Sequence, residues 1–292
     1  MSKKILITGA TGLIGKEAIP YLIKKGYEIY AITTTQRMSN NFVNWLKCDL
    51  CDYDSLKQVF AKVKPEFLLH FAWITGGDYL TNQMNISLRD AGMNMLKLFK
   101  EYGGKRAVYA GTCFEYDLKT GDELKETTDI NPKTLYAKCK NELHEFCQKY
   151  SKENNLSFGW GRIFYVYGHN EKSTRLTAAI IDSLKNNKEF VLGAPNNKLD
   201  YMYSKDIARA FITFLESSYE GSVNICNNNG VLLKDYALKI QELMGKKDLI
   251  KFDANKKAEL KVTGDNTILK TKIGYTSQYS LDTGLKEIIS KL

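Results

Sequence analysis

The sequence predicts an α/β protein built on a doubly wound parallel β-sheet, with a smaller mixed α/β region over the carboxyl edge of that sheet. Two observations support this prediction. Short apolar segments of strand length alternate with segments of helical periodicity along the N-terminal part of the chain. Beyond about residue 166 the predicted elements become shorter and more mixed, which is typical of a smaller second domain.

The alternating elements place the main sheet in the N-terminal part of the chain. Strands are expected at residues 4–8, 28–33, 67–71, 106–111 and 157–166, and helices at residues 12–25, 54–63, 81–100 and 136–150. We therefore assign residues 1–166 to the sheet domain, with a further strand near residues 222–226. Residues 167–292 are expected to form mainly a substrate-binding domain, intertwined with the first because no Pro/Gly/Ser-rich linker separates them.

Composition and charge favour a soluble globular protein. Of the 292 residues, 43% are hydrophobic and 26% are charged, and no apolar run approaches the roughly 18 residues of a membrane span. The N-terminus lacks the apolar core of a secretory signal, so we expect a cytoplasmic protein. The formal net charge of +9 comes from dispersed lysines, without the basic and aromatic runs of a nucleic-acid groove.

The cysteines and histidines predict neither disulfides nor a metal site. Six cysteines are scattered along the chain, as expected for reduced thiols. Cys48 and Cys51 form a C-x-x-C pair, but no second pair and no suitably spaced histidines complete a tetrahedral zinc site. We therefore expect no bound metal.

A glycine-rich turn joins the first predicted strand to the first predicted helix. It reads Thr8-Gly9-Ala10-Thr11-Gly12-Leu13-Ile14-Gly15. Gly9 permits a tight turn, Gly12 lets backbone N–H groups approach a pyrophosphate, and Gly15 lets the helix pack closely on the strand. The helix N-terminus adds partial positive charge for the phosphates. Because a second strand follows, the segment predicts a Rossmann-type dinucleotide site rather than a plain turn.

The end of the second predicted strand bears on the choice of cofactor. An Asp or Glu there would bind the ribose hydroxyls of NAD and repel the extra phosphate of NADP. This chain has Thr33, Thr34 and, after Thr35 and Gln36, Arg37. Hydroxyls and a guanidinium suit a phosphate, so NADP is favoured and NAD is the alternative. The other interpretation is that Arg37 is a surface residue in a polar loop.

Three further residues form a candidate catalytic set. Tyr136 and Lys140 lie four residues apart, which places them one turn apart on the same helix face. An ammonium there would lower the pKa of the phenol and favour its use as an acid/base group at neutral pH. Thr112 follows the strand over 106–111, at the carboxyl edge of the sheet, where its hydroxyl can hold a substrate oxygen.

These residues resemble the extended short-chain dehydrogenase/reductase family, in particular its nucleotide-sugar epimerase, reductase and dehydratase branch. The likeness spans nearly the whole chain and includes the segment Gly161-Arg162-Ile163-Phe164-Tyr165-Val166-Tyr167-Gly168. By this resemblance, further cofactor contacts are expected from Asp49, Leu50, Phe71, Ala72, Trp73 and Ile163.

The same resemblance implies roles and a quaternary structure. Lys140 would bind the nicotinamide ribose, and Tyr136 would act as acid/base at the C4 oxygen of a sugar while hydride passes between C4 and the nicotinamide. The helices over 81–100 and 136–150 resemble those that pair two subunits into a four-helix bundle. A homodimer is therefore expected.

Departures from the family pattern narrow the reaction. In the 4,6-dehydratases two acids follow the catalytic threonine, whereas Cys113 and Phe114 follow Thr112. Dehydration is therefore not expected, and Glu115 stands one place out of register. Two positions that hold the nucleotide diphosphate also differ, since Tyr165 replaces an asparagine and Leu199 an arginine. The candidate substrate contacts are Cys113, Phe114, Tyr165, Arg175, Lys198 and Tyr201, with Arg175 and Lys198 as the phosphate partners.

The sequence thus favours a 4-ketoreductase, or in reverse a 4-dehydrogenase, acting on a nucleoside-diphosphate sugar. The expected substrate is a 4-keto-6-deoxy sugar destined for a bacterial surface polysaccharide. The alternative is a 4-epimerase that uses the same residues and retains NAD. A non-catalytic dinucleotide-binding protein is a third reading, which the presence of both Tyr136 and Lys140 disfavours.

Overall fold

The main body of the protein is a seven-stranded parallel sheet with the strand order β10-β6-β5-β4-β1-β2-β3. The computed structural model describes residues 3–118, 123–253 and 260–292. The strands of this sheet are β1 (Lys3–Thr8), β2 (Tyr27–Thr33), β3 (Val43–Lys47), β4 (Phe67–His70), β5 (Arg106–Thr112), β6 (Ser157–Ile163) and β10 (Gly221–Ile225). The sheet reverses its winding at β1, which pairs with β2 on one side and β4 on the other.

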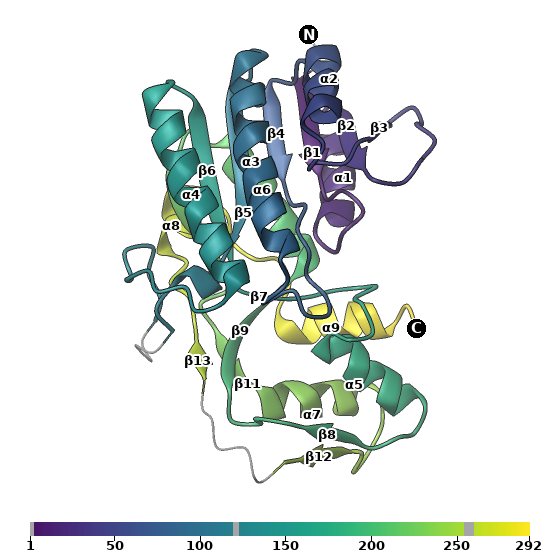
Figure 1. The fold of residues 1–292 in the computed structure, drawn as a ribbon. Helices are drawn as coiled ribbons and strands as arrows, with labels where there is room; N and C mark the ends of the chain where they lie inside the picture. The colour runs from purple at the N-terminus through teal and green to yellow at the C-terminus, as the bar shows by residue number, and fades with distance from the viewer. Residues whose placement is uncertain (1–2, 119–122, 254–259) are drawn as a thin grey trace.

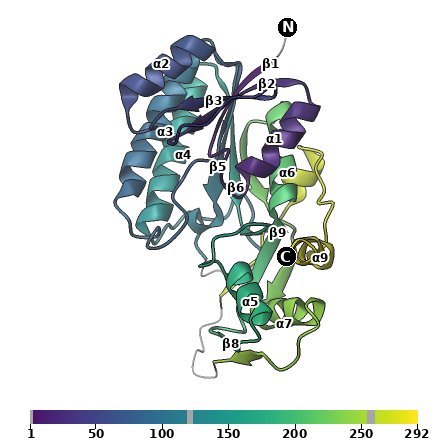
Figure 2. The same ribbon diagram turned by 90° about the vertical axis from the view of Figure 1, so that its right-hand side faces the viewer.

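Helices cover both faces of the sheet, as Figure 2 shows edge-on. One face carries α2 (Tyr53–Val63), α3 (Met84–Glu101) and α4 (Leu135–Glu153), and the other carries α1 (Gly15–Lys24), α6 (Ser204–Glu216) and α8 (Thr267–Thr271). Successive side chains of β1 point to opposite faces of the sheet, which explains the two helical layers. Ile5 and Ile7 belong to the core under α1 and α6, whereas Leu6 belongs to the core under α2 to α4. The predicted doubly wound α/β fold is confirmed.

A smaller α/β region lies over the carboxyl edge of the sheet (Figure 1). Its elements are β7 (Tyr165–Tyr167), β9 (Lys198–Tyr203), β11 (Gly230–Leu232) and β13 (Lys261–Val262) in one sheet, β8 (Phe190–Leu192) and β12 (Ile250–Phe252) in another, and the helices α5 (Leu176–Lys185), α7 (Leu233–Leu243) and α9 (Leu281–Ile289). These elements share a separate, aromatic-rich core. The region therefore closes one side of the space beyond the strand ends.

The structure departs from the expected elements at two places. Residues 157–166 form two strands, since β6 ends at Ile163 and β7 begins at Tyr165. Phe164 between them donates its backbone N–H to the carbonyl of Ile225 at the end of β10. β7 then pairs with β9 in the smaller sheet. The second departure is β3, an edge strand that the sequence analysis did not predict because only Val43 in it is buried. The strand expected near residues 222–226 is β10, which pairs along β6. The helix α6, which was not predicted, also packs on the main sheet from the second half of the chain.

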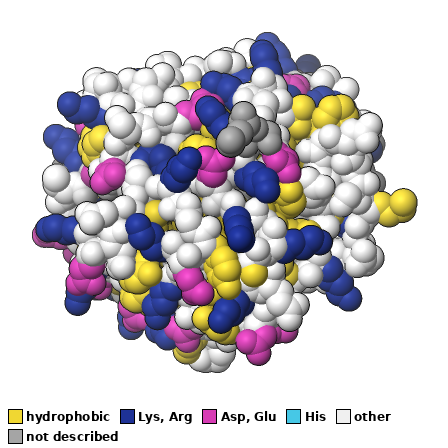
Figure 3. Space-filling model, turned by 90° about the horizontal axis from the view of Figure 1, so that it is seen from above, with side chains coloured by type: hydrophobic (Ala, Val, Ile, Leu, Met, Phe, Trp, Pro, Cys, Tyr) yellow, Lys and Arg dark blue, Asp and Glu magenta, His cyan; other side chains and the backbone are white. Residues whose placement is uncertain are grey.

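The surface is mixed in charge and apolar character. Figure 3 shows Lys and Arg side chains interspersed with Asp and Glu on the face seen from above Figure 1. That face therefore has no uniform basic patch. Of the helices in the described ranges, none combines the length and the apolar character that crossing a bilayer requires.

Candidate active site

A cavity of about 400 Å³ lies where β1, β2, β4, β5 and β6 end against the smaller region. Its lining includes most of the residues singled out in the sequence. These are Gly9, Thr11, Gly12, Leu13, Ile14, Gly15, Thr33, Thr34, Leu50, Phe71, Ala72, Trp73, Thr112, Cys113, Phe114, Tyr136, Lys140, Ile163, Tyr165 and Arg175. The fold thus gathers these dispersed segments at one edge of the sheet, beside the reversal point of the strand order.

The glycine turn leaves bare backbone at the floor of the cavity. Gly9 has a φ of +68°, and a Cβ on it would lie 2.7 Å from the backbone nitrogen of Ala72. A Cβ on Gly15 would lie 2.1 Å from the carbonyl oxygen of Gly9. Side chains are therefore excluded at both positions, and α1 begins directly above the turn at Gly15. This cradle fits a dinucleotide pyrophosphate.

The cavity wall at the end of β2 is polar and uncharged. Thr33 and Thr34 line it, and no carboxylate belongs to the cavity lining within the described part of the chain. Arg37 lies outside the lining, with its guanidinium 5.2 Å from the ring centroid of Trp45. A cation–π contact of this kind holds Arg37 beside β3, one short loop away from Thr34.

Tyr136 is held in the first turn of α4. The hydroxyl of Thr134 caps this helix by accepting the backbone N–H of Ala137 at 3.1 Å. The Tyr136 ring then packs edge-on against Tyr79, with 5.2 Å between the ring centroids, and against Phe114 at 6.4 Å. Burial raises the pKa of the Tyr136 phenol well above its usual range, and a side-chain hydrogen bond with Thr112 opposes this rise.

Lys140 lies one turn further along α4 and is 3% exposed. Its ammonium donates to the carbonyl of Ala110 at 2.8 Å and sits 3.6 Å from the ring centroid of Trp73. Burial lowers the pKa of Lys140 to about 7, and the negative charge of Glu115 partly offsets this lowering. Lys140 therefore titrates near neutral pH in the protein without ligand.

The pKa of the Tyr136 phenol differs from the value expected from the sequence. The spacing of Tyr136 and Lys140 was expected to lower the pKa of the phenol, whereas burial raises it. The reason is that the Lys140 ammonium is directed at Ala110 and Trp73 and itself suffers desolvation. Tyr136 is accordingly protonated at neutral pH and suited to donate a proton rather than to accept one.

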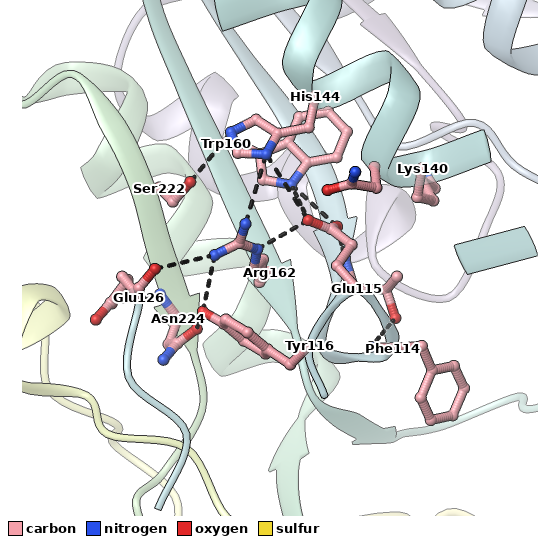
Figure 4. Close-up of polar contacts among 12 residues, drawn as sticks. Phe114, Glu115, Tyr116, Glu126, Lys140, His144, Trp160, Arg162, Ser222 and Asn224 are labelled. Carbon is pink, nitrogen blue, oxygen red and sulfur yellow. Dashed lines mark hydrogen bonds and ion pairs between the residues drawn. The ribbon is translucent and has the colours of Figure 1, made fainter. Parts of the chain in front are cut away.

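Glu115 faces away from the cavity, although it is the carboxylate nearest to Thr112 in sequence. A short 3-10 turn over Cys113–Glu115 carries its side chain behind β5, where it is fully buried and accepts the backbone N–H of Thr112 at 2.8 Å. Figure 4 shows it bound to Trp160 and Arg162 of β6. Glu115 is therefore not placed to contact a ligand in the cavity.

The predicted substrate residues divide into two groups. Cys113, Phe114, Tyr165 and Arg175 line the cavity. Arg175 also donates to the carbonyl of Thr75 at 3.4 Å, so its guanidinium bridges to the segment that follows β4. Burial raises the pKa of the Cys113 thiol, which keeps it neutral and unreactive.

Lys198 and Tyr201 do not line the cavity, and this corrects the expectation that they contact the substrate. Both are on β9, but the Tyr201 ring stacks on Tyr236 at 4.4 Å inside the core of the smaller region, and Lys198 is exposed at the start of the strand. Asp49 also lies outside the lining, with its carboxylate accepting the backbone N–H of Cys51.

Several lining residues were not predicted from the sequence. They are Thr8, Ile32, Cys48, Thr75, Tyr79, Ala110, Gly111, Phe164 and Val166. Most of them are next to residues that were predicted, so the positions of the strand ends could have been used to predict them. Tyr79 had no such signal, because its contact with Tyr136 arises only when the segment after β4 folds over α4.

Replacing Lys140 by Met should remove a pH dependence of stability in the ligand-free protein. Because the folded-state pKa is about 7 and the usual value is 10.5, the unfolded chain binds the proton more tightly between these values. Burial of Lys140 therefore costs most stability below pH 7, and this cost disappears as the pH rises toward 10. The unfolding free energy of wild type minus that of Lys140→Met should rise from pH 6 to pH 9, measured by urea denaturation.

Lys138→Met is the matched control, since Lys138 is exposed on the same helix. Its difference from wild type should stay flat over this pH range. An equally flat difference for Lys140→Met would contradict the described burial of the ammonium.

Comparison with known proteins agrees with this geometry. Residues 5–226 match the NAD dependent epimerase/dehydratase family. The chain is 24% identical to CDP-abequose synthase of Salmonella muenchen over 299 residues, which cover 99% of this chain and 98% of that protein. UDP-glucose 4-epimerase of Thermotoga maritima, solved with UDP-glucose, matches with a TM-score of 0.89 at 21% identity over 99% of both chains. UDP-glucose 4-epimerase of Thermus thermophilus, solved with NAD, matches with a TM-score of 0.87 at 20% identity over 98% of both. The resemblance drawn from the sequence is confirmed, and the chain belongs to the NAD dependent epimerase/dehydratase family.

Proposed function

We propose that this protein is a 4-ketoreductase, or in reverse a 4-dehydrogenase, of a nucleoside-diphosphate sugar. The observation that carries the proposal is the meeting of Thr112, Tyr136 and Lys140 in one cavity with the bare glycine turn. The names of the relatives support a nucleotide-linked sugar as substrate, since they act on or are solved with such compounds. A bound nicotinamide supplies the hydride.

In this mechanism Tyr136 donates the proton and Thr112 orients the substrate oxygen. Reduction of a ketone leaves negative charge on that oxygen, so a group that is protonated at neutral pH is needed beside it. Tyr136 meets this need because burial raises its pKa. Lys140 lies one helical turn away, where its ammonium would bind the ribose of the nicotinamide. At neutral pH the phenol is therefore present in the protonated form that reduction of a ketone requires.

The proposed substrate is a 4-keto-6-deoxy sugar used for surface polysaccharide. Aromatic side chains form the cavity wall beside the candidate proton donor. Trp73, Tyr79 and Phe114 pack against Tyr136, and Tyr165 packs against Phe114. An apolar wall of this kind suits a sugar that has lost a hydroxyl, because a buried hydroxyl without a partner would be penalised. Arg175 supplies the positive charge for the diphosphate.

The proposed cofactor is NADP. Thr33 and Thr34 leave the wall at β2 free of the carboxylate that would exclude a 2′-phosphate, and Arg37 lies one short loop away.

We also propose a homodimer through α3 and α4. These helices lie side by side on the outer face of the sheet, joined by an ion pair between Arg89 and Glu142.

A 4-epimerase with tightly bound NAD is the second candidate, favoured by the match to two 4-epimerase structures. Native mass spectrometry and absorbance at 340 nm discriminate the two candidates. A reductase should purify largely without cofactor and consume external NADPH with a 4-keto sugar. Retained NAD, with sugars interconverted at constant absorbance, would instead establish the epimerase.

Substitution of Tyr136 by Phe tests the catalytic role. The ring contacts should remain, so NADPH should bind with unchanged affinity, while turnover should fall by at least about 100-fold because the proton donor is gone. Steady-state kinetics and fluorescence titration of NADPH measure the two quantities. Tyr150→Phe, at the far end of the same helix, should behave as wild type. Full turnover in Tyr136→Phe would exclude Tyr136 as the proton donor.

Substitution of Arg37 by Ala tests the cofactor preference. If Arg37 pairs with the 2′-phosphate, the Kd for NADPH should rise roughly tenfold, because an ion-assisted hydrogen bond is lost. The Kd for NADH should change less than about twofold and serves as the internal control. Equal changes for both cofactors, or tighter binding of NADH by the wild type, would contradict the NADP assignment.

A further inference from the structure

Glu115 and Arg162 form a buried ion pair directly behind the candidate catalytic residues. Glu115 is fully buried and Arg162 is 3% exposed. The Nε of Arg162 donates to the Glu115 carboxylate at 2.8 Å, and the indole nitrogen of Trp160 donates to the same carboxylate at 3.0 Å. With the backbone N–H of Thr112, this gives the carboxylate donors on three sides.

The remaining donors of Arg162 are also paired, as Figure 4 shows. Nη1 donates to the hydroxyl of Tyr116 at 2.9 Å, and that hydroxyl donates to the amide oxygen of Asn224 at 2.7 Å. The Glu126 carboxylate accepts the backbone N–H of Asn224 at 2.8 Å. The network therefore joins the ends of β5, β6 and β10, and its satisfied hydrogen bonds offset the cost of burying two charges.

This arrangement places a fixed negative charge near Lys140. The Lys140 ammonium is bound to the carbonyl of Ala110, two residues before Thr112. The Glu115 carboxylate is bound to the backbone N–H of Thr112 on the same strand, so both side chains are anchored at the end of β5. The attraction of Glu115 raises the pKa of Lys140 against the lowering by burial.

The other titratable groups near Lys140 do not supply this charge. Burial raises the pKa of the Cys147 thiol and so keeps it neutral. Burial and the Lys140 charge hold the pKa of His70 well below its usual value, and burial beside Arg162 lowers the pKa of His144 to about 3. Both histidines are therefore neutral at pH 7, which leaves Glu115, within the described part of the chain, as the anion anchored at the same strand end as the ammonium.

We propose that Glu115 is a positioning residue, which acts through Lys140 by supplying a negative charge at the end of β5 that favours the ammonium form of this side chain. The role of that ammonium in turnover rests on the proposed function, but its charge state does not. Glu115 thereby has a different task from the acids of the dehydratases. It faces the back of the strand and never reaches the substrate.

The test is the titration of Lys140 in the ligand-free protein. Lysine labelled with ¹³C at Cε gives one NMR signal per side chain, and Lys140→Arg identifies the signal of Lys140. The midpoint should lie near 7 in the wild type. It should fall by at least about one pH unit in Glu115→Gln, because removal of a nearby opposite charge favours the neutral amine.

Two control variants separate charge from structure. Glu126→Gln removes a carboxylate from the far side of the same network and should leave the Lys140 midpoint unchanged. Glu115→Asp keeps the charge and should hold the midpoint close to the wild-type value. If Glu115→Gln does not fold because Arg162 is left unpaired, the double variant Glu115→Gln/Arg162→Met removes both charges together and should still lower the midpoint.

An unchanged midpoint in a folded Glu115→Gln or double variant would overturn the proposal and leave Glu115 a purely structural residue. A lowered midpoint in a protein that reduces no nucleotide sugar would sustain the proposal and refute the proposed function instead. The proposed role of Glu115 and the proposed function can therefore be refuted independently of each other.

Discussion

The close approach of bare backbone at the end of β1 is the constraint on which the site depends. Gly9 meets the strand end at Ala72, and Gly15 meets the carbonyl of Gly9, at separations that leave no room for a Cβ. This contact brings the start of α1 down to the sheet edge and keeps the cavity floor free of side chains. The carboxyl ends of β1, β4 and β5 are then neighbours, so Thr112 and the first turn of α4 face the same space.

Burial in the cavity wall determines the pKa values of the candidate catalytic residues. The wall around Tyr136 and Lys140 is aromatic, which raises the proton affinity of the phenol and lowers that of the amine. The pKa values of the two side chains, which are similar in water, are thus moved apart: the phenol is protonated at neutral pH, whereas the amine titrates near pH 7. The buried pair of Glu115 and Arg162 adds charge where the wall itself has none.

The sequence was most informative where a local pattern decides the structure. The strand, glycine turn and helix at the N-terminus and the spacing of Tyr136 and Lys140 are local, and the structure brings them to one cavity. Features set by long-range contacts could not be read in this way. Residues 157–166 have the pattern of one continuous strand, yet the strand is interrupted at Phe164 because β7 pairs with β9 in the smaller sheet. A long-range contact also decides the position of Tyr201, whose ring stacks on Tyr236 in the core of the smaller region.

The central claim is that hydride moves between a nicotinamide in this cavity and C4 of a nucleotide-linked sugar. The most direct measurement supplies the enzyme with NADPH carrying deuterium at the transferring position and a panel of nucleoside-diphosphate 4-keto sugars. Mass spectrometry and NMR of the product then locate the label. Hydride transfer to C4 should give a sugar with one deuterium bound to C4. Label that stays on the cofactor with every sugar, or that appears at another carbon, would contradict it.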